Sequence, residues 1–108
     1  AALKRLGGDE ELFHDMIGFF QEDYPGLLDQ LRRGLLSDDS RAVERAAHSL
    51  KGLAANCGSG PAVQAAARVE QFGREKRLTK ASEAVEWLVS ELQRLSEALA
   101  VDRGRGIS

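Results

Sequence analysis

The chain has few cysteines, few aromatic residues and no long apolar run, and each shortage excludes a class of protein. Cys57 is the only cysteine among 108 residues, so neither an internal disulfide nor a cysteine-ligated zinc site can form. The 15 Lys and Arg residues are outnumbered by 17 Asp and Glu residues, which argues against the basic face that binds nucleic acid non-specifically. No apolar run approaches the roughly 20 residues of a membrane span. We therefore expect neither nucleic-acid binding nor direct membrane contact.

What the chain does contain is enough for one folded domain. Hydrophobic residues make up 43% of it and aromatic residues 6%, so the core should consist mainly of Leu, Ala and Val. The first residues include neither an initiator methionine nor a hydrophobic leader. We expect a domain that belongs to a longer protein and is monomeric on its own.

Apolar residues recur with a helical period along almost the whole chain, and no segment alternates as a strand would. Pro25 suits the first turn of a new helix, so we expect a short leading helix that starts at Asp9 to end before it. The two could instead form one helix kinked at the proline. The other predicted helices cover about residues 25–36, 41–57, 61–77 and 80–101, the last capped by Thr79.

Short connections between these helices make neighbouring helices antiparallel. We expect an all-α fold, an antiparallel up-down four-helix bundle, with the short leading helix covering one end. The predicted domain spans residues 1–101. Residues 102–108 have no helical pattern and should form a disordered tail.

His48 is the residue that departs from this pattern. It lies about 140° from the centre of the apolar stripe of its helix, at roughly 100° per residue, so its imidazole should face solvent. Lys51 follows one turn later, and the small residues Gly52 and Ala55 lie on the same side. An exposed imidazole beside a cation and small neighbours suits a nucleophile that meets a phosphoryl group on another molecule. The stripe itself consists of Val43, Ala47, Leu50, Ala54 and Cys57.

The spacing His48-x-Leu50-Lys51-Gly52, followed by Gly58, resembles the signature of the histidine-containing phosphotransfer (HPt) family. The preceding Ala46-Ala47 also fits, and residues 6–12 resemble the usual opening of the family's leading helix. The resemblance covers about residues 1–100. It implies a bundle that carries one phosphoryl group on the histidine, taken from the aspartate of a receiver domain and passed to a response regulator. Many such domains end hybrid sensor histidine kinases, so we expect a bacterial, cytoplasmic setting.

The resemblance also implies roles for individual residues. His48 would be the phosphoacceptor, Lys51 would lie beside the phosphoryl oxygens, and Gly52 would keep the surface open. Gly58 would end the helix. Glu70 takes the place of a polar residue, commonly glutamine; because a carboxylate repels a phosphoryl group, we expect it to pair with Lys51 or to orient the imidazole.

The remaining expectations concern cofactors and partners. No nucleotide-binding loop or magnesium-ligating carboxylate cluster is evident, so we expect no cofactor, no ATP site and no enzyme activity in the domain alone. Mg²⁺ should be held by the partner receiver domain. Phe13, Met16 and Ile17 are candidates for a docking patch. Two alternatives are a phosphoacceptor domain of a chemotaxis-type kinase and a non-catalytic helical adaptor.

Overall fold

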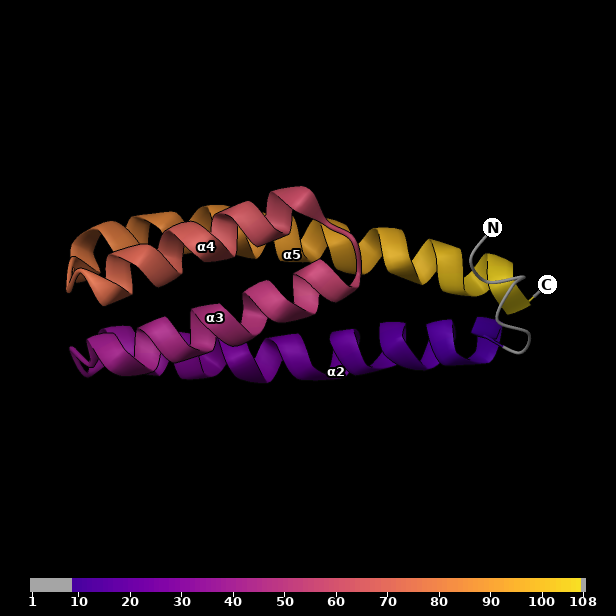
Figure 1. The fold of residues 1–108 in the computed structure, drawn as a ribbon, viewed down its shortest axis with the longest axis horizontal. Coiled ribbons are helices and arrows are strands. Elements are labelled where there is room, and N and C mark those ends of the chain that lie inside the picture. The colour runs from indigo at the N-terminus through magenta and orange to yellow at the C-terminus, as the bar shows by residue number, and fades with distance from the viewer. Residues whose placement is uncertain (1–8, 108) are drawn as a thin grey trace.

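A computed structural model describes the backbone of residues 9–107 and the side chains of residues 15–101. Over that range the chain consists of helices joined by short turns, without a strand, which confirms the predicted all-α class and is consistent with a helical bundle. Figure 1 shows the helices side by side, with consecutive helices running in opposite directions. Contacts between helices link α2 to α3, α3 to α4, α4 to α5, and α5 back to α2. Their bounds are α2 Asp9–Leu36, α3 Ser40–Asn56, α4 Gly60–Arg74 and α5 Leu78–Ile107.

Helix α2 passes through Pro25 without interruption, so the expectation of a separate short leading helix is wrong and the single-helix alternative holds. A proline inside a helix removes one backbone hydrogen bond and costs about 3 kcal/mol. Here apolar side chains on both sides of it are buried in the bundle and offset that cost: Ile17 and Phe20 before the proline, and Leu28 and Leu31 after it. Tertiary burial therefore outweighs the local preference for a helix start.

The core lies between the four helices and follows the predicted stripes. On α3, Val43, Ala47, Leu50 and Ala54 are fully buried, while Cys57 at the helix end is half-buried. Burial raises the pKa of the Cys57 thiol, which favours its protonated form. The seam of α5 is also buried, apart from the half-buried Leu95; its members are Val85, Leu88, Leu92 and Leu99.

Residues at each end of α3 explain where this helix begins and where it ends. The Asp39 side chain caps the first turn by accepting a hydrogen bond from the Ala42 backbone N–H at 3.1 Å. At the other end Gly58 has a φ of +76°, the left-handed conformation that glycine adopts most easily. Its N–H donates to the carbonyl of Ala55 at 3.0 Å. Gly58 thus lies where it was expected to end the helix.

Helix α5 is longer than the sequence pattern predicts. It begins at Leu78, with Thr79 inside its first turn, and the Arg77 carbonyl accepts the Ala81 N–H at 3.0 Å. It continues to Ile107, whereas residues 102–108 were expected to form a non-helical tail. Adding a residue to an existing helix gains one hydrogen bond without a new nucleation cost, so a helix can extend past its apolar pattern.

Two glycines set how closely α3 approaches its neighbours. A Cβ added to Gly34 of α2 would lie 3.0 Å from the Val43 Cγ2 atom. One added to Gly73 of α4 would lie 3.0 Å from the backbone nitrogen of Glu44. Any larger side chain at either position would push the helices apart. The contact at Gly73 brings side chains of α4 within reach of α3.

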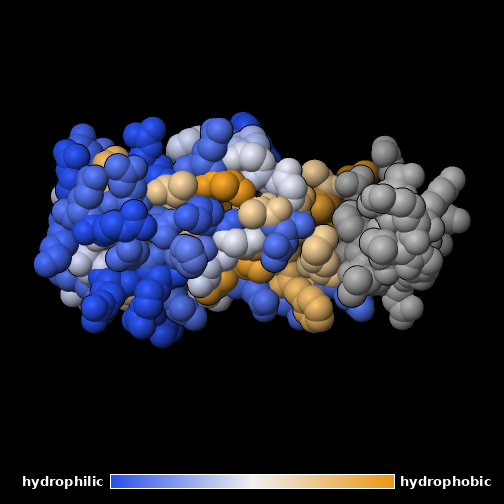
Figure 2. Space-filling view, viewed as in Figure 1, coloured by the Kyte–Doolittle hydropathy of each residue, from blue (hydrophilic) through white to orange (hydrophobic). Residues whose placement is uncertain are grey.

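The surface of the bundle is unevenly polar. Figure 2 shows that the end carrying the α2–α3 and α4–α5 connections is mostly hydrophilic, while apolar residues gather nearer the other end. Phe19 of α2 and Val101 of α5 are two exposed apolar side chains, at 60% and 55%. Within the described part of the chain, no helix has both the length and the apolar content that crossing a bilayer requires.

Candidate functional site

His48 lies on the outer face of α3, with 67% of its side chain exposed. Its exposure agrees with the helical-wheel argument. The following Ser49, Gly52 and Ala55 are also exposed. A Cβ added to Gly52 would meet no atom within 4 Å, so the space above this glycine is open. The imidazole therefore stands on a surface that a second protein can approach.

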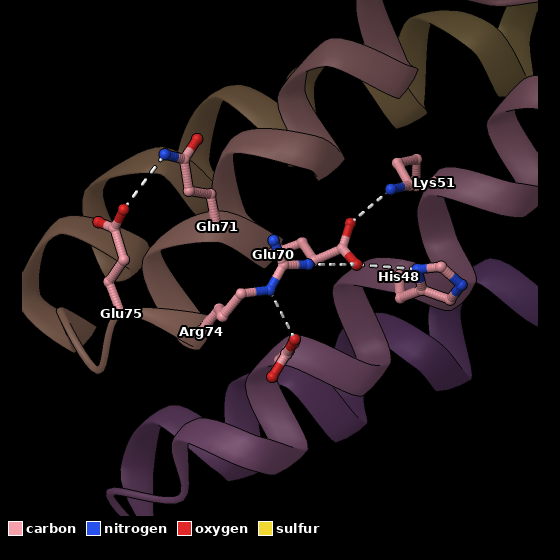
Figure 3. A network of polar contacts seen from close by, with 7 residues as sticks. His48, Lys51, Glu70, Gln71, Arg74 and Glu75 are labelled. Carbon is pink, nitrogen blue, oxygen red and sulfur yellow. Dashed lines mark hydrogen bonds and ion pairs between the residues drawn. The ribbon is translucent and has the colours of Figure 1, made fainter.

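Glu70 reaches this histidine from α4 and is the only buried charged residue among side chains 15–101. Its Oε2 atom lies 2.8 Å from Nδ1 of His48, and its Oε1 atom lies 2.6 Å from Nζ of Lys51. Figure 3 shows the carboxylate between the two side chains. The two roles considered for Glu70, pairing with Lys51 and orienting the imidazole, thus occur together.

Arg74 and Glu44 extend this network, and sequence reasoning missed both. Nη2 of Arg74 lies 3.3 Å from Oε2 of Glu70, and its Nε atom lies 3.0 Å from Oε2 of Glu44. Helical spacing could have indicated both residues, because Arg74 follows Glu70 by four residues and Glu44 precedes His48 by four. Residues four apart share one face of a helix.

The electrostatic balance keeps Glu70 ionised. Burial by itself raises the pKa of this carboxyl group, because a charge loses hydration when it leaves water. Hydrogen bonds from Lys51 and His48, together with the positive charge of Lys51 and that of His48 when its ring is protonated, outweigh burial and hold the pKa of Glu70 below its ordinary value. The nearby Arg74 is charged as every arginine is at neutral pH, and its hydrogen bond to Glu44 raises the pKa of the guanidinium further. Glu70 is accordingly a carboxylate at neutral pH.

An ionised carboxylate assigns the tautomer of the neutral imidazole. A carboxylate can only accept hydrogen bonds, so Nδ1 of His48 must carry the proton in the contact with Glu70. The lone pair of the neutral ring then belongs to Nε2. Figure 3 shows this second nitrogen on the side of the ring away from Glu70. The arrangement presents an unprotonated nitrogen to solvent.

Lys51 does not stand free beside the histidine. It was expected near phosphoryl oxygens, but its Nζ atom is bound to Glu70 and 32% of its side chain is exposed. A lysine has a flexible four-carbon stem, so this ammonium can change partners without movement of the helix.

Of the three docking candidates from the sequence, Phe13, Met16 and Ile17, the two whose side chains the structure describes differ in exposure. Ile17 is fully buried and cannot form a docking patch, because its position on α2 faces the bundle core. Met16 is half-buried, and the side chain of Phe13 lies outside the described residues.

Two hollows flank the exposed face of α3. One includes Arg41, Arg45, Glu44, His48, Ser49 and Glu70 in its lining. The other includes Glu22, Asp23, Gly26, Leu27, Ser49 and Gly52.

Comparison with known proteins agrees with this geometry. The family model of the Hpt domain matches residues 15–98, which is most of the chain and includes every residue of the network. Searches of curated proteins and of solved structures gave no match. The chain therefore belongs to the Hpt domain family, whose members are phosphocarrier modules of two-component phosphorelays that interact with receiver domains.

Proposed function

We propose that His48 accepts a phosphoryl group from the aspartate of a receiver domain and passes it to the aspartate of a response regulator. The observation that carries the proposal is the contact between the exposed imidazole and the buried carboxylate of Glu70. That contact leaves Nε2 as the nucleophilic atom on an open surface. The match to the Hpt family supports phosphotransfer in general, and the direction through receivers is our inference.

The transfer step balances without a proton leaving the protein. The Nε2 lone pair attacks the phosphorus of the aspartyl phosphate, and the bond between phosphorus and the aspartate oxygen breaks. The products are a free aspartate carboxylate and an Nε2-phosphorylated imidazolium that still carries its Nδ1 proton. Glu70, 2.8 Å from Nδ1, stabilises the positive charge that develops on the ring. In the reverse step a receiver carboxylate attacks the phosphorus and the neutral imidazole leaves.

Lys51 and Gly52 would serve the same step in different ways. Lys51 can exchange Oε1 of Glu70 for a phosphoryl oxygen, because both acceptors are anionic and its stem is flexible. Gly52 has open space above it, so the backbone of a receiver domain can approach the helix there. Gly58 supports the site indirectly by ending α3.

The metal ion for the reaction would come from the partner. We expect Mg²⁺ on the receiver domain, where it would neutralise charge on the transferring phosphoryl group. We assign no residue of this chain to the metal. The parent protein would be a hybrid sensor histidine kinase with this domain in the cytoplasm.

The proposal is tested with three phosphoryl donors: a phosphorylated receiver domain, a chemotaxis-type kinase core with ATP, and phosphoramidate as a small donor. Acid-labile phosphate on the wild-type protein but not on His48→Gln is the expected result with the receiver. Labelling by the kinase core alone would support a chemotaxis-type phosphoacceptor instead. No labelling by any donor would leave a helical adaptor.

A further inference from the structure

Glu70 has three partners, and they divide between its two oxygens. Lys51 binds Oε1, whereas His48 and Arg74 share Oε2. Arg74 also binds a second carboxylate, Glu44, at 3.0 Å. Within side chains 15–101, Lys51 has no carboxylate partner other than Glu70. Arg74 is therefore bound by two carboxylates, Glu70 and Glu44, whereas Lys51 is bound by Glu70 alone.

This difference matters once a phosphoryl group is on the histidine. A phosphoryl group brings a charge of about −1.5 to −2 and three acceptor oxygens. A flexible lysine follows such a charge readily, while the planar guanidinium of an arginine is preorganised for the acceptors it already has. If Lys51 leaves Glu70, the buried carboxylate needs another cation, because an uncompensated buried charge is unfavourable. Arg74 would then remain on Glu70, beside the positively charged ring of phosphorylated His48.

The backbone of α4 lies close to α3 at the position next to Arg74. The preceding residue, Gly73, is buried, and a Cβ there would lie 3.0 Å from the Glu44 backbone nitrogen. The ion pair between Arg74 and Glu44 thus spans a close contact between α4 and α3. It ties the end of α4 that carries Glu70 to the helix that carries His48.

We propose that Arg74, anchored by Glu44, is a positioning residue that keeps Glu70 on Nδ1 of His48 while Lys51 serves the phosphoryl group. The inference rests on the proposed phosphorylation of His48 and assigns a division of labour between the two cations. Arg74 touches neither the phosphoryl group nor the partner in this scheme. It acts through Glu70, so its removal should alter the phosphorylated state more than the unphosphorylated one.

The test compares wild type with Arg74→Met and Glu44→Gln, with Arg74→Lys as the conservative variant. Arg94→Met is the matched control, because Arg94 is also an exposed arginine paired with a glutamate, on α5. Each protein is phosphorylated with phosphoramidate. Nitrogen-15 NMR of the His48 ring then reports the Nδ1 proton, and the loss of acid-labile phosphate reports the lifetime of phosphohistidine.

In Arg74→Met we expect the Nδ1 proton of phosphorylated His48 to exchange with water about threefold to tenfold faster, the effect of one weakened hydrogen bond. Phosphate should be lost faster by a similar factor. Glu44→Gln should move both readouts in the same direction, Arg74→Lys should restore part of the loss, and Arg94→Met should match wild type. A phosphorylated Arg74→Met protein that matches wild type in both readouts overturns the inference alone. A wild-type protein that takes no phosphoryl group overturns the proposed function, and the inference falls with it.

Discussion

Nδ1 of His48 lies 2.8 Å from Oε2 of Glu70, a contact between an exposed ring on α3 and a buried carboxylate on α4. The carboxylate holds one ring nitrogen protonated, so that the other presents its lone pair to solvent. In the proposed transfer it would also face the positive charge that the ring acquires with the phosphoryl group. One contact thereby fixes the tautomer, the orientation and the charge compensation of the proposed nucleophile.

Replacing the histidine separates chemistry from folding. His48→Gln should abolish phosphoryl acceptance and change the free energy of unfolding by no more than about 0.5 kcal/mol, because the side chain is 67% exposed. The glutamine amide can still donate to Glu70. Thermal unfolding and acid-labile labelling measure the two effects, and a large loss of melting temperature would contradict the exposed position of the ring.

Lys51→Ala should slow transfer from a receiver while leaving the protein folded. The variant removes a 2.6 Å ion pair to the buried Glu70, but Arg74 and His48 remain as its partners, so the cost in stability should be about 1–3 kcal/mol. Lys80→Ala is the control, since Lys80 pairs with Glu83 on the surface of α5. Equal transfer rates in both variants would remove Lys51 from the mechanism.

Variants at Gly52 should separate the docking of a receiver domain from the phosphorylation of His48 itself. Gly52→Ala should stabilise the protein by up to about 1 kcal/mol, because a Cβ meets nothing there and alanine favours the helix. Gly52→Gln should slow transfer from a receiver domain yet leave labelling by phosphoramidate unchanged, since the small donor needs no docking surface. If receiver transfer is as fast as in wild type, partners do not use this part of α3.

Gly73→Ala should have the opposite effect on stability. Its Cβ would lie 3.0 Å from backbone nitrogen of Glu44, and backbone cannot rotate away, so the helices must separate at a cost of about 1–3 kcal/mol. Gly26→Ala is the matched control, because a Cβ at Gly26 meets nothing within 4 Å and should stabilise α2 slightly. Urea unfolding measures both, and equal shifts would mean that the contact at Gly73 is not tight.

The ionised state of Glu70 predicts a dependence of stability on pH. Burial opposes its charge, but Lys51 and His48 hold the pKa of Glu70 below its ordinary value. Its carboxylate therefore stabilises the folded protein above the ordinary glutamate pKa of about 4.3, and this contribution is lost as pH falls through the lower folded pKa. Between about pH 5 and about pH 3, the free energy of unfolding should fall more for wild type than for Glu70→Gln. Parallel curves would contradict the stabilising role of the carboxylate.

Local patterns in the sequence predict much of this protein. Periodicity places Val43, Leu50 and Leu92 in the core and His48 outside it, because the face of a helix depends only on spacing along the chain. Turn chemistry places Gly58 at the end of α3 for the same local reason. The continuity of α2 through Pro25 could not be read this way, since burial on both sides of the proline decides it.

The same distinction between local sequence and tertiary packing applies to the candidate site. Sequence alone determines that His48 is exposed, that Lys51 shares its helix and that Glu70 comes from the next one. Only the tertiary structure decides that Glu70 binds both of them and that Arg74 and Glu44 complete the network. Helical spacing specifies which way a side chain points but not how far apart two helices lie. That distance depends on the packing of α4 against α3, which Gly73 allows to be close.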